Sequence, residues 1–110
     1  MTASADIFHR LMAVVEDRQV HRPPNSYTAR LFEGGVEVIG GKVLEEAAEV
    51  VNAARRARND GSHSVAHEAA DLVYHLLVLL AASKVSLSDV EAELARRFGA
   101  SGLEEKASRK

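Results

Sequence analysis

A long apolar stretch limits the folds open to this sequence. The segment 72–82, LVYHLLVLLAA, is apolar on nearly every side once it is wound into a helix. A helix that is apolar all round is buried all round, and a membrane span needs about 20 apolar residues, more than this run supplies. The few other short helices of a 110-residue chain can hardly cover it. We therefore expect an all-α helical bundle, with about four to five helices per chain, that dimerisation completes.

The rest of the sequence also reads as helix. Strand-like alternation is absent, and apolar residues recur at three- and four-residue spacing. Pro23 and Pro24 end the first helix, Ser26 is a good N-cap for a short second one, and Gly34-Gly35 stops it. The expected helices cover residues 5–20, 27–32, 36–58, 65–84 and about 88–98.

The later helix starts are predicted by capping residues. Ser64 can cap the apolar helix after a turn at 59–62, and Ser88 with Glu91 forms a capping-box pattern for the last helix, which ends near Phe98. Residues 1–110 are expected to form a single domain. Within it, residues 1–25 supply the N-terminal helix and the Pro-Pro linker, and 99–110 form a tail.

Composition excludes several classes of function. The chain has 14 basic and 16 acidic residues, so no basic field suggests a nucleic-acid partner. It has no cysteine, which excludes disulfides, thiolate metal sites and a cysteine nucleophile. The N-terminus carries Asp6, His9 and Arg10 without a long apolar core, so it does not read as a signal peptide. We expect a cytoplasmic protein with neither nucleic-acid nor membrane partners.

Acidic side chains fall on the apolar faces of the two longest expected helices. At about 100° per residue, Glu46 lies inside the apolar sector of its helix, Glu49 at its edge, and Glu45 further towards solvent. On the next helix, Glu68 lies inside the stripe and Asp71 at its margin. If the two helices pack on these stripes, four carboxylates meet.

Four ionised carboxylates in a small, partly dry volume require compensation. Burying one uncompensated ion costs several kcal/mol, and like charges add to that cost. Either the groups stay partly protonated or a cation holds them together. Hard oxygen ligands select Mg²⁺, Mn²⁺ or Ca²⁺ over zinc, and Mg²⁺ with open water positions commonly binds polyphosphates. The expected cofactor is Mg²⁺, with Mn²⁺ as an alternative.

An ordinary solvated acidic face is the competing interpretation. Lys42 precedes Glu45 and Glu46 by three and four residues, where surface ion pairs form. Alanine rather than lysine around the acids (EEAAE, EAAD) favours the metal site, because solvated acidic faces usually interleave basic residues. On its apolar stripe, His75 is more simply interpreted as a hydrogen-bonded core histidine than as a metal ligand.

The acidic pattern resembles that of a known superfamily. Glu-Glu-x-x-Glu on one helix and Glu-x-x-Asp on the next are similar to the all-α NTP pyrophosphohydrolases, which include MazG-like proteins and dimeric dUTPases. The flanking segments SYTARLFEGG, KVLEEAAEVV, EAADLVYHLLVLL and RRFGASGLEEKASR resemble phosphoribosyl-ATP pyrophosphohydrolases from about residue 26 onwards. The resemblance implies hydrolysis of phosphoribosyl-ATP to phosphoribosyl-AMP and pyrophosphate, the second step of histidine biosynthesis. It also implies a separate phosphoribosyl-AMP cyclohydrolase as the neighbouring enzyme of the pathway.

The resemblance also implies roles for individual residues. It places the Mg²⁺ ligands at Glu46, Glu49, Glu68 and Asp71, the same four that helix geometry selects. Glu45 is then the acid that orients or deprotonates the attacking water. Candidate phosphate-binding cations are Lys42, Arg30, Arg97 and Lys106, with Arg96 and Arg109 as further possibilities.

Two other functions remain open at this point. One is a house-cleaning nucleoside triphosphate pyrophosphohydrolase of the same superfamily. The other is a non-catalytic helical dimer whose acids bind only cations or a partner. The SYTxxLF and SGxEEKASR segments favour the histidine-pathway enzyme, because they go beyond what metal binding requires.

Overall fold

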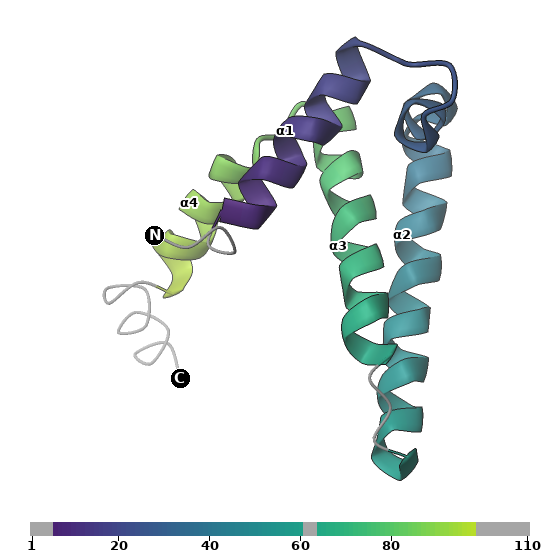
Figure 1. Cartoon of the computed structure of the whole chain (residues 1–110). Helices are drawn as coiled ribbons and strands as arrows, with labels where there is room; N and C mark the ends of the chain where they lie inside the picture. The colour runs from purple at the N-terminus through teal and green to yellow at the C-terminus, as the bar shows by residue number, and fades with distance from the viewer. Residues whose placement is uncertain (1–5, 61–63, 99–110) are drawn as a thin grey trace.

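The computed structural model describes residues 6–60 and 64–98, which form four α-helices and no strand. These helices are α1 (Ile7–Val20), α2 (Tyr27–Asp60), α3 (Ser64–Ala82) and α4 (Leu87–Phe98). Figure 1 shows α2 and α3 side by side as an antiparallel hairpin, with α1 crossing α3 and α4 beside the start of α1. The all-α fold is confirmed for this part of the chain, while dimerisation stays a prediction. The expected tail, 99–110, lies outside the described residues.

A bend at Gly35 divides α2 into the two helical segments that the sequence predicts. Gly35 has φ 75° and ψ −172°, a backbone conformation that essentially only glycine adopts. In Figure 1 the segment before the bend is seen nearly end-on, at the top of the long remainder of α2. Ser26 caps this segment, its Oγ accepting from the Ala29 N–H at 3.1 Å, as expected. The bend brings Tyr27 and Thr28 against the side of α3.

The hydrophobic core lies where α1 and both segments of α2 meet α3. Ile39 and Val78 have no exposed surface, and Val15 is almost as deeply buried. Ile39 belongs to the apolar stripe expected on the long helix, and Val78 to the apolar run of α3. The core cluster consists of Met12, Val15, Leu31, Phe32, Ile39, Leu77, Val78 and Ala81. This core fixes the α2–α3 hairpin on which the acidic side chains stand.

The boundary between α3 and α4 differs from the expectation. The last residue of α3 is Ala82 rather than residue 84, because Lys84 adopts the left-handed conformation with φ 62°. Ser86, and not Ser88, caps α4: its Oγ accepts from the Asp89 N–H at 3.0 Å, while Asp89 Oδ2 accepts from the Ser86 N–H at 3.2 Å. The capping box therefore pairs Ser86 with Asp89, two residues earlier than predicted.

Much of α3 stays uncovered in a single chain. Among the described residues, α3 is the one helix that by its length and composition could cross a membrane, and its mean hydropathy is 1.4 over 18 residues. At 19 residues, α3 is longer than the apolar run 72–82, which alone is too short to span a membrane. The core helix of a soluble protein can be equally long and apolar. Only 22% of that window is buried inside the chain. The uncovered surface includes Leu76, which is 42% exposed.

Candidate active site between α2 and α3

Three carboxylates from the two long helices converge on one point. Glu46 of α2 and Glu68 and Asp71 of α3 each offer an oxygen, and the three oxygens lie within 4.8 Å of one another. The antiparallel packing of the two helices joins them, because Glu68 and Asp71 are three residues apart and share one face of α3. All three are partly buried, and the Glu46 side chain is only 12% exposed.

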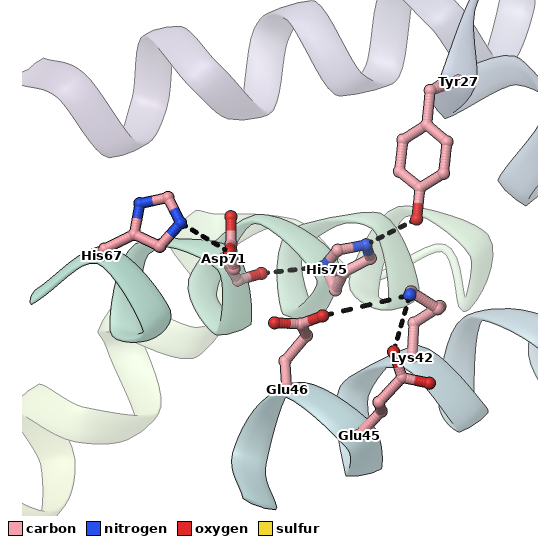
Figure 2. A network of polar contacts seen from close by, with 7 residues as sticks. All are labelled: Tyr27, Lys42, Glu45, Glu46, His67, Asp71 and His75. Atoms are coloured by element: carbon pink, nitrogen blue, oxygen red, sulfur yellow. Dashed lines mark hydrogen bonds and ion pairs between the residues drawn. The ribbon is translucent and has the colours of Figure 1, made fainter. Parts of the chain in front are cut away.

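Lys42 lies at the edge of this carboxylate group, one helical turn before Glu46. Its Nζ donates to Glu45 Oε1 at 2.9 Å and lies 4.0 Å from Glu46 Oε2 (Figure 2). The hydrogen bond from Lys42 holds the pKa of Glu45 below its usual range, and the same bond raises the pKa of Lys42. Glu45 itself is 59% exposed, so its carboxylate is accessible to water while it remains ionised.

His75 joins the carboxylate region to the first segment of α2. It is buried, with 5% exposure, and its Nδ1 lies 2.8 Å from the backbone oxygen of Asp71. Its Nε2 lies 3.0 Å from the Tyr27 hydroxyl, while Tyr74 hydrogen-bonds to Thr28 alongside. The prediction of a hydrogen-bonded core histidine is confirmed. Sequence reasoning missed Tyr27 here; the SYT segment was the one signal for it.

The remaining predicted site residues lie outside the carboxylate group. Glu49 is exposed and is not among the three converging residues. Arg30 is exposed on the first segment of α2, and Arg97 of α4 donates to Glu93 at 2.7 Å. Lys106 falls outside the described residues. Of the four predicted phosphate-binding cations, Lys42 is therefore the one that the described structure brings to the acidic cluster.

Similarity to known proteins identifies the family. The model of a family described as phosphoribosyl-ATP pyrophosphohydrolase matches residues 8–98. The chain belongs to this family. A protein of Rhodopirellula baltica named phosphoribosyl-ATP pyrophosphatase is 49% identical over 91% of this chain and 83% of its own length. A protein of the same name from Rhodobacter capsulatus is 51% identical over 91% of this chain and 94% of its own length. A third protein of this name, from Methylococcus capsulatus, is 47% identical over 96% of this chain and 97% of its own length.

Membership of the phosphoribosyl-ATP pyrophosphohydrolase family confirms the expected family and enzyme class. A biosynthetic enzyme family also favours the soluble interpretation of α3. The geometry fits a hard divalent cation, because Glu46, Glu68 and Asp71 offer only carboxylate oxygens, the donors that Mg²⁺ and Mn²⁺ prefer. The imidazole of His67, also on α3, lies at the edge of the group, with its Nε2 3.6 Å from Asp71 Oδ2.

Proposed function

We propose that this member of the family hydrolyses phosphoribosyl-ATP to phosphoribosyl-AMP and pyrophosphate, the second step of histidine biosynthesis, in the cytoplasm with Mg²⁺. The carboxylate group of Glu46, Glu68 and Asp71 carries the proposal, because it is suited to a cation that binds polyphosphate. The relative from Methylococcus capsulatus, which matches this chain over nearly its whole length, is named for this reaction. The product would pass to a phosphoribosyl-AMP cyclohydrolase.

The metal-binding role is assigned to α2 and α3 together. Glu46, Glu68 and Asp71 would hold the ion, and Glu49, one turn after Glu46, is proposed as an additional ligand. When bound, Mg²⁺ would neutralise polyphosphate charge and stabilise the charge that develops on the phosphoryl oxygens. The partial burial of Glu46 strengthens these electrostatic interactions, because the effective dielectric constant is lower than in bulk water.

Lys42 and Glu45 supply the remaining chemistry. A polyphosphate offers its oxygens to the Lys42 ammonium, in competition with Glu45, which holds that ammonium in the free protein. Glu45 is exposed, and once a phosphate takes the Lys42 ammonium from it, its carboxylate is released to accept a proton from the attacking water. The water oxygen then bonds to phosphorus as the anhydride bond between the α- and β-phosphates breaks. Phosphoribosyl-AMP and pyrophosphate leave, and the proton stays on Glu45.

The Glu45→Gln substitution tests this assignment. We expect turnover to fall by about 100- to 10,000-fold, the usual contribution of a general base, while Mg²⁺ affinity is retained, because Glu45 lies outside the three-carboxylate group. Pyrophosphate release measured with phosphoribosyl-ATP, ATP and dUTP, and Mg²⁺ titration by calorimetry, give the two readouts. Equal loss of metal affinity would instead make Glu45 a ligand. A parent protein that hydrolyses ATP or dUTP as fast as phosphoribosyl-ATP would support the house-cleaning alternative.

We also propose that the protein is a homodimer in which the α2–α3 hairpins of two copies pack together. Leu44 is 75% exposed and Leu76 is 42% exposed, although both belong to the helices that hold the core. About one helical turn before Leu44, Gly40 and Gly41 have open space around an added Cβ, so another helix can approach closely. An apolar depression with these two glycines, Leu44 and Leu79 in its lining receives the second copy.

Changing Leu76 to lysine should produce a folded monomer. The side chain already reaches solvent in one chain, so a lysine there fits the isolated subunit but places a charge in the dimer interface. Light scattering should give the mass of two chains for the parent and about 11.9 kDa for the variant. The matched control is Val20→Lys, at an exposed apolar residue on α1, which should remain dimeric. A parent mass of one chain would refute the dimer.

A further inference from the structure

A chain of hydrogen bonds runs from the backbone of Asp71 through the ring of His75 to Tyr27. The His75 Nδ1 lies 2.8 Å from the Asp71 carbonyl oxygen, and its Nε2 lies 3.0 Å from the Tyr27 hydroxyl (Figure 2). Because His75 is buried at 5% exposure, water competes little with these bonds. The position of the Tyr27 hydroxyl is thus tied to a residue of the carboxylate group.

The chain has a fixed direction. A carbonyl oxygen only accepts hydrogen bonds, so the Nδ1 of His75 carries the hydrogen that Asp71 receives. In a neutral imidazole the other nitrogen then has a free lone pair, and the Tyr27 hydroxyl donates its single hydrogen to it. The Tyr27 oxygen keeps only its capacity to accept. It can bind a ligand N–H or O–H, but not an ionised phosphate, which offers acceptors alone.

The Tyr27 hydroxyl lies on the Lys42 side of His75 (Figure 2). The Tyr27 ring packs against Tyr74 with centroids 6.3 Å apart and meets the edge of His75 at 5.9 Å, and Tyr27 remains 44% exposed. Figure 2 shows the Tyr27 hydroxyl and the Lys42 ammonium on the same side of the His75 ring. A ligand with phosphates at Lys42 therefore has its nucleoside part within reach of Tyr27.

We propose that Tyr27 binds the nucleoside part of the substrate, its hydroxyl oxygen accepting a hydrogen bond from a ribose hydroxyl or a base N–H. His75 acts through Tyr27 as a positioning residue, since it takes the phenol hydrogen and leaves the oxygen as an acceptor. The inference rests on the proposed function for the identity of the substrate. It adds a recognition group for the nucleoside to a site otherwise built for metal and phosphate.

Tyr27→Phe separates nucleoside recognition from phosphate recognition, because it removes only the oxygen. Calorimetry with Mg²⁺, in a Glu45→Gln background that slows turnover, should show phosphoribosyl-ATP binding weakened by about 3- to 10-fold, the effect of one hydrogen bond. Inorganic tripolyphosphate should bind unchanged. Tyr74→Phe is the matched control, because its hydroxyl bonds to Thr28 and not to His75, and it should leave both ligands unaffected. Equal weakening of tripolyphosphate, or no weakening of phosphoribosyl-ATP, would overturn the proposal.

A double-substitution cycle tests His75. His75→Asn can keep a donor near the Asp71 carbonyl but has nothing at the Nε2 position, so it should weaken phosphoribosyl-ATP binding and leave tripolyphosphate binding unchanged. His75→Gln, whose side-chain oxygen can accept from Tyr27, should restore part of the affinity. Adding Tyr27→Phe to His75→Asn should cost nothing beyond Tyr27→Phe alone. Additive effects would refute the positioning role.

Failure of the proposed function can be distinguished from failure of the Tyr27 proposal. A parent protein that neither binds nor hydrolyses phosphoribosyl-ATP would refute that function. In that case the Tyr27→Phe comparison is made with ATP against tripolyphosphate. Selective loss of ATP affinity would then still support nucleoside recognition by Tyr27, and parallel behaviour of the two ligands would refute it.

Discussion

Glu46→Gln and Asp71→Asn should each lower Mg²⁺ affinity by at least about 100-fold and reduce pyrophosphate release accordingly. Residues that only support a metal ligand already contribute about 10- to 100-fold to affinity or activity, so loss of a carboxylate that contacts the ion costs more. Glu46 comes from α2 and Asp71 from α3, and both carboxylates belong to the converging group. Calorimetric Mg²⁺ titration and an assay of phosphoribosyl-ATP hydrolysis measure the two effects. Variants that bind Mg²⁺ like the parent would mean that the metal site is misassigned.

The Mg²⁺ affinity of Glu49→Gln should be measured beside that of Glu46→Gln. Glu49 follows Glu46 by one helical turn but is exposed, and its carboxylate is not part of the converging group. We therefore expect a smaller loss of Mg²⁺ affinity than for Glu46→Gln. A loss as large as that of Glu46→Gln would make Glu49 a full ligand, and an unchanged affinity would remove it from the site.

The carboxylate group was predictable because its members follow helical periodicity. Glu46 and Glu68 fall inside the apolar stripes of their helices, and a stripe must face another helix. Asp71 and Glu49 both lie at the edge of a stripe, where residue angle alone does not say which edge faces the partner helix. In the structure, Asp71 converges with Glu46 and Glu68, whereas Glu49 is exposed.

Other features depend on information that periodicity does not carry. The sequence contains two candidate capping boxes near the start of α4, and the structure uses Ser86 with Asp89, the earlier of the two. The contact between Tyr27 and His75 spans 48 positions and depends on the direction of the bend at Gly35. A Gly-Gly pair predicts where a helix is interrupted, but not where the next segment points.

Millimolar Mg²⁺ should raise the melting temperature of the parent protein by about 10–20 °C at neutral pH. A ligand at about 100 times its dissociation constant adds about 2.7 kcal/mol to the free energy of unfolding when it binds only the folded state. In a domain of about 100 residues, each kcal/mol corresponds to about 4–8 °C. The ion would cross-link α2 and α3 through Glu46, Glu68 and Asp71, and it replaces carboxylate repulsion with attraction. Scanning calorimetry with and without Mg²⁺, at matched ionic strength, measures the shift.

The control for this experiment is the double variant Glu46→Gln, Asp71→Asn. Without metal it should melt at a higher temperature than the parent, because two of the mutually repelling charges are gone while the side chains keep nearly the same shape. Its melting temperature should not respond to Mg²⁺, because one carboxylate, Glu68, remains of the three that converge. If the parent were equally unresponsive, the acids would not hold Mg²⁺ in the free protein, and the non-catalytic interpretation would gain support. A shift in the parent alone would assign the effect to the carboxylate group between α2 and α3.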